Sequence, residues 1–173
     1  SNTFWYVLLT VAAATAMGIL LAWANERTDA RMDRLAGILP ILPLMVPPIG
    51  SALGYLMLFS ERSGIGNLFL RWLLGLEGNT GPVAINTFTG MVFVTAISLV
   101  PIVYLIVSAA LNNLDASLDE ASRVFGGTPF RTARRITLPL VWPAITSAAL
   151  LIAIHAVSSF SFPYIIGSGA GVT

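Results

Sequence analysis

The chain has 173 residues, of which 56% are hydrophobic and only 10% are charged, and its mean hydropathy is +0.84. Soluble domains carry about 25% charged residues, so the composition excludes an ordinary water-soluble protein and indicates one that lies in a lipid bilayer. The nine basic residues are all Arg and balance eight acidic ones, which leaves no basic stripe for nucleic acid. Without cysteine, this sequence has no disulfides or thiolate metal sites.

Four segments meet the requirement of about 20 mostly apolar residues for a membrane-spanning helix. They are, in chain order, residues 3–24, 38–59, 82–111 and 138–166. None of them contains Asp, Glu, Lys or Arg, and the last contains the only histidine, His155. The predicted fold class is therefore all-α, a polytopic transmembrane helical bundle with about four spans, and its surroundings are the lipid bilayer.

Prolines and small residues predict how these segments pack. Pro101 interrupts the third segment, and four prolines crowd the second, namely Pro40, Pro43, Pro47 and Pro48. Proline removes a backbone donor, which lipid tolerates only where neighbouring protein satisfies the freed carbonyls. We therefore expect bends at the prolines and contacts with other helices. The first segment has small residues that allow close helix approach, namely Ala12, Ala13, Ala14, Ala16 and Gly18.

The arginines predict the orientation in the membrane. The first and third loops hold seven of them, namely Arg27, Arg31, Arg34, Arg123, Arg131, Arg134 and Arg135, and the second loop holds only Arg62 and Arg71. Because basic residues are enriched in cytoplasmic loops, the first and third loops are expected in the cytoplasm and both ends of the sequence outside. We expect the sequence to be a piece of a longer protein with at least one earlier span.

The third loop, residues 112–137, begins with the signals of a short helix. Ser117-Leu118-Asp119-Glu120 has the form of a capping box at a helix start, and Asp119 can pair with Arg123 four residues later. One apolar stripe is formed by Leu114, Leu118, Ala121 and Phe125. Gly126-Gly127 is predicted to end this helix, since glycine accepts the left-handed backbone conformation of a C-terminal cap.

A second short helix is predicted directly afterwards. Thr128 is a suitable N-cap, and Pro129 at the first helical position sacrifices no hydrogen bond. Arg131, Arg134 and Arg135 follow, before Leu138-Pro139 leads into the fourth span. The loop is therefore interpreted as two short amphipathic helices with a sharp bend between them, and such a projection into the cytoplasm has the form of a docking element.

The spacing in this loop resembles the EAA loop of binding-protein-dependent ABC importer permeases. Glu120-Ala121-Ser122, then Gly126, then Ile136-Thr137-Leu138-Pro139 matches the family pattern, with Ser122 in place of the second alanine. The resemblance implies the MetI-like permease core. Further residues are similar to the ferric iron, thiamine and polyamine branch, namely Asn2-Thr3, Leu21-Ala22-Trp23, Arg27-Thr28-Asp29, Ser159-Phe160 and Phe162-Pro163.

This resemblance implies partners rather than an enzymatic activity of the chain itself. A cytoplasmic ATP-binding subunit dimer docks on the loop, a periplasmic or lipid-anchored binding protein delivers the substrate, and a second permease half lies in the same chain or another subunit. The implied location is the bacterial inner membrane, and no cofactor is expected. The implied coupling residues are Glu120, Ala121, Ser122, Phe125 and Gly126. Glu120 can alternatively act as a helix cap alone, and the arginines can serve orientation alone.

Polar residues in the fourth segment offer a candidate substrate path. His155, Ser158 and Ser159 can line such a path, since polar groups inside a membrane are costly and often functional. Alternatively, the histidine bonds a neighbouring helix and the serines bond helix carbonyls. The rival function is an ion-coupled secondary transporter, which usually needs carboxylates at membrane depth. The function of a membrane enzyme is disfavoured, because a nucleophilic serine would need a base that only His155 could supply. A purely structural membrane scaffold would leave the loop spacing unexplained.

Overall fold

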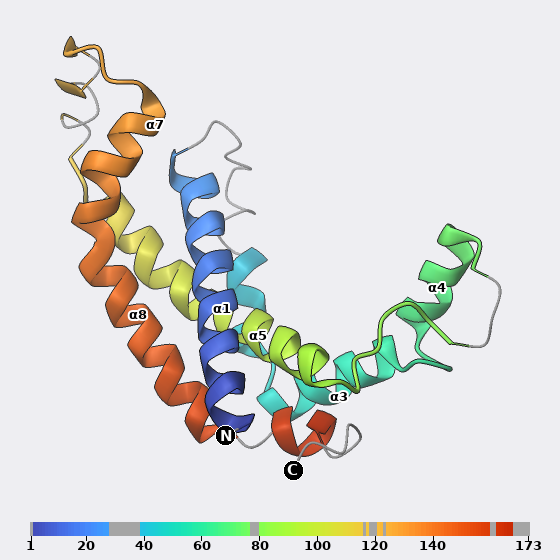
Figure 1. Ribbon diagram of the computed structural model, residues 1–173. Coiled ribbons are helices and arrows are strands. Elements are labelled where there is room, and N and C mark those ends of the chain that lie inside the picture. The colour runs from blue at the N-terminus through green and yellow to red at the C-terminus, as the bar shows by residue number, and fades with distance from the viewer. Residues whose placement is uncertain are drawn as a thin grey trace. The chain divides into compact units, whose positions relative to one another are not determined.

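The computed structural model describes residues 2–27, 39–76, 80–115, 117, 121–122, 124–159 and 162–167, and these residues form helices and connecting turns without a β-strand (Figure 1). The α-helices are α1 (Asn2–Arg27), α3 (Pro48–Phe59), α4 (Ile65–Leu74), α5 (Phe88–Asn112), α7 (Pro129–Thr132) and α8 (Leu138–Ser158). A 3-10 helix, η1, covers Leu39–Met45, and two π-helical segments are η2 (Ala133–Thr137) and η3 (Pro163–Gly167). The all-α prediction is confirmed.

Among the residues that the structure describes, three continuous helical stretches are long and apolar enough to cross a membrane. They are Asn2–Arg27, Phe88–Asn112 and Phe130–Ser158, and the last runs without interruption through α7, η2 and α8. At 1.5 Å per residue the 25 residues of α5 extend about 37 Å, which exceeds the roughly 30 Å of a hydrocarbon core. Three of the four predicted spans therefore contain a helix of sufficient length.

The predicted second span, residues 38–59, is not one helix. Residue 38 lies outside the described residues, η1 ends at Met45 and α3 begins at Pro48. Between them Pro47 has φ −55° and ψ 142°, because a residue that precedes proline is driven out of the α region. The prolines therefore divide the segment into pieces of seven and 12 residues, and neither piece alone reaches spanning length.

The structure also changes the ends of the third and fourth predicted spans. The third was expected from residue 82, but α5 starts at Phe88 after an irregular stretch. The fourth was expected to reach residue 166, but α8 ends at Ser158 and η3 starts a separate turn at Pro163. Proline cannot donate to the preceding turn, which favours this break. Pro101, in contrast, lies fully buried inside a continuous α5.

A helix that the sequence analysis did not predict lies between the second and third spans. Residues 60–81 were assigned to a connecting loop, yet Ile65–Leu74 forms α4. Its ten residues fall far below the length of a span. The length of an apolar segment, which predicted the spans, therefore did not predict this helix. A left-handed Gly75 ends the helix, with its N–H bonded to the Arg71 carbonyl.

The chain forms two compact units. Unit 1 comprises Ser1–Ala13, Pro43–Ser98 and Ala153–Thr173, and unit 2 comprises Ala14–Leu42 and Leu99–Ile152. In unit 1, η3 contacts α3, and the Tyr6 hydroxyl donates to Thr95 Oγ1 at 3.0 Å. The core of unit 1 is formed by Tyr6, Ala52, Ile85, Met91, Val92, Val94, Phe162 and Ile166.

One buried amide organises the irregular stretch before α5. Asn67 on α4 is 1% exposed, and its Nδ2 donates to the carbonyl oxygens of Phe59, Ser60 and Val83 at 2.9–3.1 Å. Its Oδ1 accepts the Val83 N–H at 3.1 Å. Gly81 lies directly against this side chain, where a Cβ would overlap it. The residues before α5 are not helical and lack the hydrogen bonds of a helix. The Asn67 amide instead satisfies the backbone N–H and carbonyl of Val83.

In unit 2, a glycine lets α1 approach α5 closely. A Cβ built on Gly18 would lie only 2.5 Å from Cβ of Val103, a separation that real structures do not permit. Val103 is completely buried at this contact. The sequence predicted that small residues of α1 permit close packing. At Gly18 the observed contact requires this, because any side chain would collide with Val103.

Two helical glycines give a matched test of this packing. Gly18→Ala is expected to lower the thermal unfolding midpoint of the purified protein in detergent, because the new methyl group collides with Val103. Gly54→Ala in α3 is expected to raise it, because nothing among the described residues lies within 4 Å of its Cβ and alanine favours a helix over glycine by about 1 kcal/mol. An unchanged or higher midpoint for Gly18→Ala would show that the α1–α5 contact is looser than described.

Candidate functional site

The loop between α5 and α7 begins with a local turn. Leu114 donates its N–H to the Leu111 carbonyl, and the Ser117 N–H donates to Asp115 Oδ1 at 2.9 Å. The hydrogen bonds from Ser117 hold the pKa of the exposed Asp115 below its ordinary value. Glu120, Asp119 and Arg123 lie outside the described residues, so the predicted capping box, the Asp119–Arg123 pair and the position of Glu120 remain predictions.

The turn at Gly126 has the geometry of a helix C-terminal cap. Gly126 has φ +73°, Phe125 donates its N–H to the Ala121 carbonyl, and Gly127 donates to the Ser122 carbonyl at 2.8 Å. A bond across five residues together with a left-handed glycine is the Schellman arrangement. A Cβ at Gly126 would meet none of the described atoms within 4 Å. Glycine is therefore favoured here by its left-handed backbone conformation and not by a lack of space for a side chain. The prediction that Gly126-Gly127 ends the helix is confirmed.

A hydrogen bond between two hydroxyls joins the two arms of this turn. Ser122 Oγ lies 2.6 Å from Thr132 Oγ1, and Thr132 Oγ1 donates to the Thr128 carbonyl at 3.1 Å. Gly127 packs directly on Ser122, where a Cβ would overlap Oγ. The serine that departs from the EAA pattern therefore has a specific partner ten residues away, which sequence spacing did not reveal.

The second arm continues directly into the last long helix. The Arg131 N–H donates to Thr128 Oγ1 at 3.4 Å, which confirms the predicted N-cap. The expected separate second helix is wrong, however, because α7 continues through η2 into α8. In η2 the Leu138 N–H reaches back to the Ala133 carbonyl, a wider π turn that precedes Pro139, the residue without a donor.

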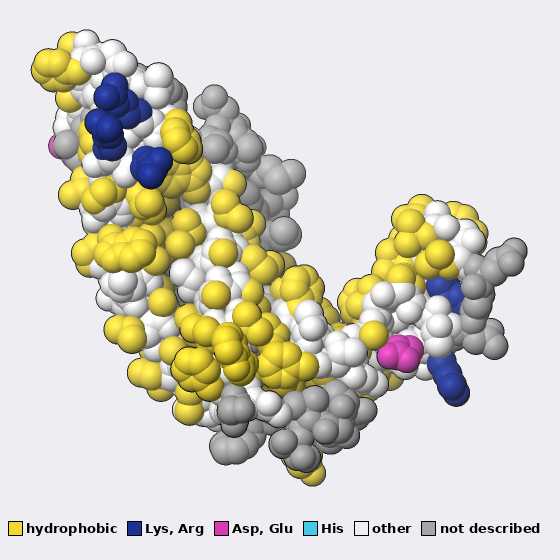
Figure 2. Space-filling view, viewed as in Figure 1, with side chains coloured by type: hydrophobic (Ala, Val, Ile, Leu, Met, Phe, Trp, Pro, Cys, Tyr) yellow, Lys and Arg dark blue, Asp and Glu magenta, His cyan; other side chains and the backbone are white. Residues whose placement is uncertain are grey.

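The tip of the loop presents large apolar side chains to the surroundings. Val124 is 83% exposed, Phe125 90% and Phe130 75%. Arg131, Arg134 and Arg135 are also exposed, and Figure 2 shows basic side chains gathered over α7 and η2. Exposed apolar groups with a charged rim are typical of a surface that binds another protein.

A polar cluster connects the ends of α1 and α5 at the start of this loop. Glu26 Oε1 accepts hydrogen bonds from Ser108 Oγ at 2.5 Å and from Asn25 Nδ2 at 2.8 Å. Asn25 Nδ2 also donates to the Tyr104 hydroxyl, and Arg27 donates to the Leu111 carbonyl. The sequence interpretation used Arg27 for orientation and for the branch resemblance, and it did not predict the cluster. The available signal was the run of polar residues 25–27 directly after a span.

The predicted substrate-path residues lie at the end of α8. His155 and Ser158 are exposed on its last turns, and Ser159 follows the helix and is partly buried. The structure shows no hydrogen bond from the His155 side chain to a described residue, and no described contact brings these three residues into one site. Their role in a path therefore stays a prediction.

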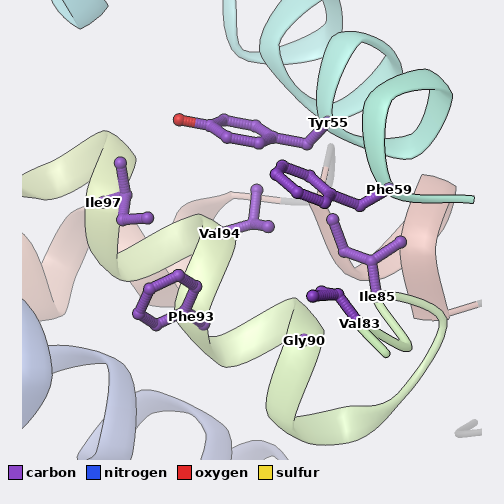
Figure 3. A pocket seen from close by; sticks show the side chains of 8 residues that line it. All are labelled: Tyr55, Phe59, Val83, Ile85, Gly90, Phe93, Val94 and Ile97. Carbon is purple, nitrogen blue, oxygen red and sulfur yellow. The ribbon is translucent and has the colours of Figure 1, made fainter. Parts of the chain in front are cut away.

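An apolar pocket of about 300 Å³ lies in unit 1 between α3 and the start of α5 (Figure 3). It is lined by Tyr55, Phe59, Val83, Ile85, Gly90, Phe93, Val94 and Ile97. Of these side chains only Tyr55 carries a polar atom, so the lining lacks the oxygen and nitrogen ligands that a metal ion requires. The pocket is an apolar cavity and not an ion-binding site.

Comparison with known proteins gives several relatives. The chain is 26% identical over 172 residues to the ferric transport system permease protein FbpB of Actinobacillus pleuropneumoniae, which covers 99% of this chain and 24% of that protein. It is 30% identical over 145 residues to the molybdenum transport system permease protein ModB of Escherichia coli K12, which covers 83% and 59%. The chain thus spans about a quarter of the length of FbpB and less than two thirds of the length of ModB.

A solved structure has the same fold. The crystal structure of a bacterial alginate ABC transporter, in complex with an alginate pentasaccharide-bound periplasmic protein, contains a chain that matches with a TM-score of 0.74 and 23% identity. The match covers 94% of this chain and 57% of that one. In addition, the sequence pattern of one transport family matches residues 14–173. Because this match extends over nearly the whole sequence, the chain belongs to the family of binding-protein-dependent transport system inner membrane components.

Proposed function

We propose that this chain forms part of the membrane-spanning permease of an ABC importer in a bacterial inner membrane, and that its third loop receives mechanical work from a cytoplasmic ATP-binding subunit dimer. Family membership supports the transport role. The observation that carries the coupling role is the exposed apolar tip at a glycine turn that joins the last long helix without a break. ATP hydrolysis takes place in the separate subunit.

The local bonding of the loop suits the transmission of force. Ser122 and Thr132 connect the two arms, and Gly127 donates to the Ser122 carbonyl across the turn. Because α7 and η2 continue into α8, a displacement of the tip moves that helix rather than a flexible linker. Phe125 and Ala121 offer exposed contact surface, whereas Ser122 and Gly126 shape it. Glu120 belongs to the same proposed docking surface.

The transport path requires partners that this chain does not supply. A second permease half, in the same protein or another subunit, completes the cavity, and a periplasmic binding protein delivers the substrate. The alginate transporter, solved with its periplasmic protein, supports this arrangement. His155, Ser158 and Ser159 are the proposed polar contribution of α8 to the path.

Ferric iron is the proposed substrate. Two relatives named as ferric transport permeases support this substrate, since they match 99% and 92% of this chain at 26% and 27% identity. Among the side chains that line the apolar pocket only Tyr55 has an oxygen atom, and one oxygen is too few to coordinate Fe³⁺. Recognition of the ion is therefore assigned to the binding protein rather than to this pocket.

Uptake by the intact transporter in proteoliposomes tests this function. With the ATP-binding subunits and binding protein present, ⁵⁵Fe³⁺ uptake is expected to require internal ATP and to persist when an ionophore collapses the ion gradients. Molybdate and alginate oligosaccharide serve as competing cargoes, and transport of one of them instead would overturn the iron assignment. Uptake that follows the ion gradient without ATP would establish the rival secondary transporter and exclude the ATP-driven one.

Phe125 gives a test of the docking surface that does not disturb folding. Because its side chain is 90% exposed, Phe125→Ser is expected to leave the thermal unfolding midpoint unchanged while it weakens ATPase binding by about tenfold or more, the loss typical of a buried aromatic contact. Phe125→Leu is the matched control and should retain most of the affinity. Binding is measured between the detergent-purified permease and the ATPase subunits, and equal affinity for all three proteins would argue against this surface.

Gly126 tests whether the shape of the turn matters for coupling. Gly126→Val and Gly126→Asn both place a side chain in the same open space, but only asparagine tolerates the left-handed backbone readily. We expect Gly126→Val to lose most of the binding-protein-stimulated ATP hydrolysis and Gly126→Asn to keep most of it, with normal insertion of both. Equal loss in the two variants would mean that the absence of a side chain is the requirement, not the backbone conformation.

A further inference from the structure

We propose that the apolar face of α4 lies in the interfacial region of the lipid bilayer, beside the end of α3. α4 comprises Ile65–Leu74 and is too short to cross the membrane, since ten residues extend only about 15 Å. The proposal concerns the surface of the helix and does not depend on the transported substrate.

The exposed face of α4 is formed by large apolar side chains at helical spacing. Ile65, Leu68, Phe69 and Trp72 are separated by three, one and three residues, so they share one face. Ile65 and Trp72 are 72% and 77% exposed. The ring centroids of Phe69 and Trp72 lie 6.0 Å apart, and the ring planes are tilted by 36°. A face of this kind is unfavourable in water, since exposed apolar area costs about 25 cal/mol per Å².

The opposite face of α4 is polar and points into the protein. Asn67 and Arg71 are four residues apart, so they lie on the same side of the helix. Asn67 is buried and bonded to Phe59, Ser60 and Val83, and Arg71 is partly buried. The helix therefore has the reverse of the arrangement in a water-soluble protein, where the apolar face is covered.

Short connections and the Asn67 bonds hold α4 at the end of an apolar membrane helix. Only five residues, 60–64, separate it from α3, and Asn67 bonds the last α3 carbonyl at Phe59. A Cβ at Gly66 would lie 2.9 Å from the Phe59 ring, which shows how closely the two helices approach. α4 is thus held directly beside the end of the apolar helix α3.

The chemistry of the face favours lipid over a protein partner. Among Ile65, Leu68, Phe69 and Trp72 the only polar group is the indole N–H of Trp72, whereas protein interfaces carry hydrogen-bonding and charged residues at their rim. Tryptophan is enriched where hydrocarbon meets the headgroups, since its ring is apolar and its N–H needs a partner. Short helices with this pattern lie in the plane of the interface.

Spin labels on single cysteines distinguish the possible surroundings. Leu68→Cys, Phe69→Cys and Trp72→Cys are labelled in the intact transporter in lipid nanodiscs, in a background without other cysteines; this stretch itself contains none. We expect each label to collide often with oxygen and rarely with a water-soluble nickel chelate, with a depth near the headgroups. Labels at the exposed Ser63 and Thr80 are the matched water-facing controls and should collide often with nickel.

Two results would overturn the proposal. Frequent nickel collisions at Phe69 and Trp72 would place the face in water, and rare collisions with both reagents would place it against a protein. A second measurement uses Asn67→Leu with the label at Trp72, in a variant checked for assembly by size exclusion. The proposal predicts a change in label depth or mobility there, because the bonds to Phe59, Ser60 and Val83 are lost. An unchanged depth and spectrum would show that Asn67 does not hold α4 at the membrane.

Discussion

The interior of a bilayer offers no water to an unpaired backbone group, so every interruption of a helix there must be compensated by the protein. The chain has several such interruptions. η1 ends at Met45 before α3 begins at Pro48, and α8 ends at Ser158 before η3 begins at Pro163. Before α5, one side chain provides the compensation, since Asn67 bonds the carbonyls of Phe59, Ser60 and Val83 and the N–H of Val83. The irregular stretch and the buried amide depend on each other.

The same accounting of hydrogen bonds applies to the described part of the third loop. Gly127 satisfies the Ser122 carbonyl, Thr128 caps the second arm, and Ser122 bonds Thr132 across the turn. At the other end, Glu26 and Arg27 bond Ser108 and the Leu111 carbonyl where α5 ends. These bonds accompany the exposed apolar side chains Val124, Phe125 and Phe130.

Two exposed apolar surfaces of the chain differ in what surrounds them, and this difference decides their proposed partners. At the tip of the loop, the exposed Phe125 and Phe130 belong to the same segment as the exposed Arg131, Arg134 and Arg135, which suits a protein surface with a charged rim. On α4, Phe69 and Trp72 form a face without charge, held at the end of an apolar helix, which suits the membrane interface. Exposure alone would not distinguish the two surfaces.

The sequence by itself determined the all-α membrane class, the three long helices, the glycine cap at Gly126 and the N-cap at Thr128. These depend on apolar length and on the conformational preferences of single residues, which act locally. Only the tertiary structure decided that residues 38–59 divide, that α4 turns its apolar face outward, and which atoms Asn67, Ser122 and Glu26 bond. Each of these depends on atoms brought together from different elements, and the spacing of residues along one chain does not record which distant groups meet.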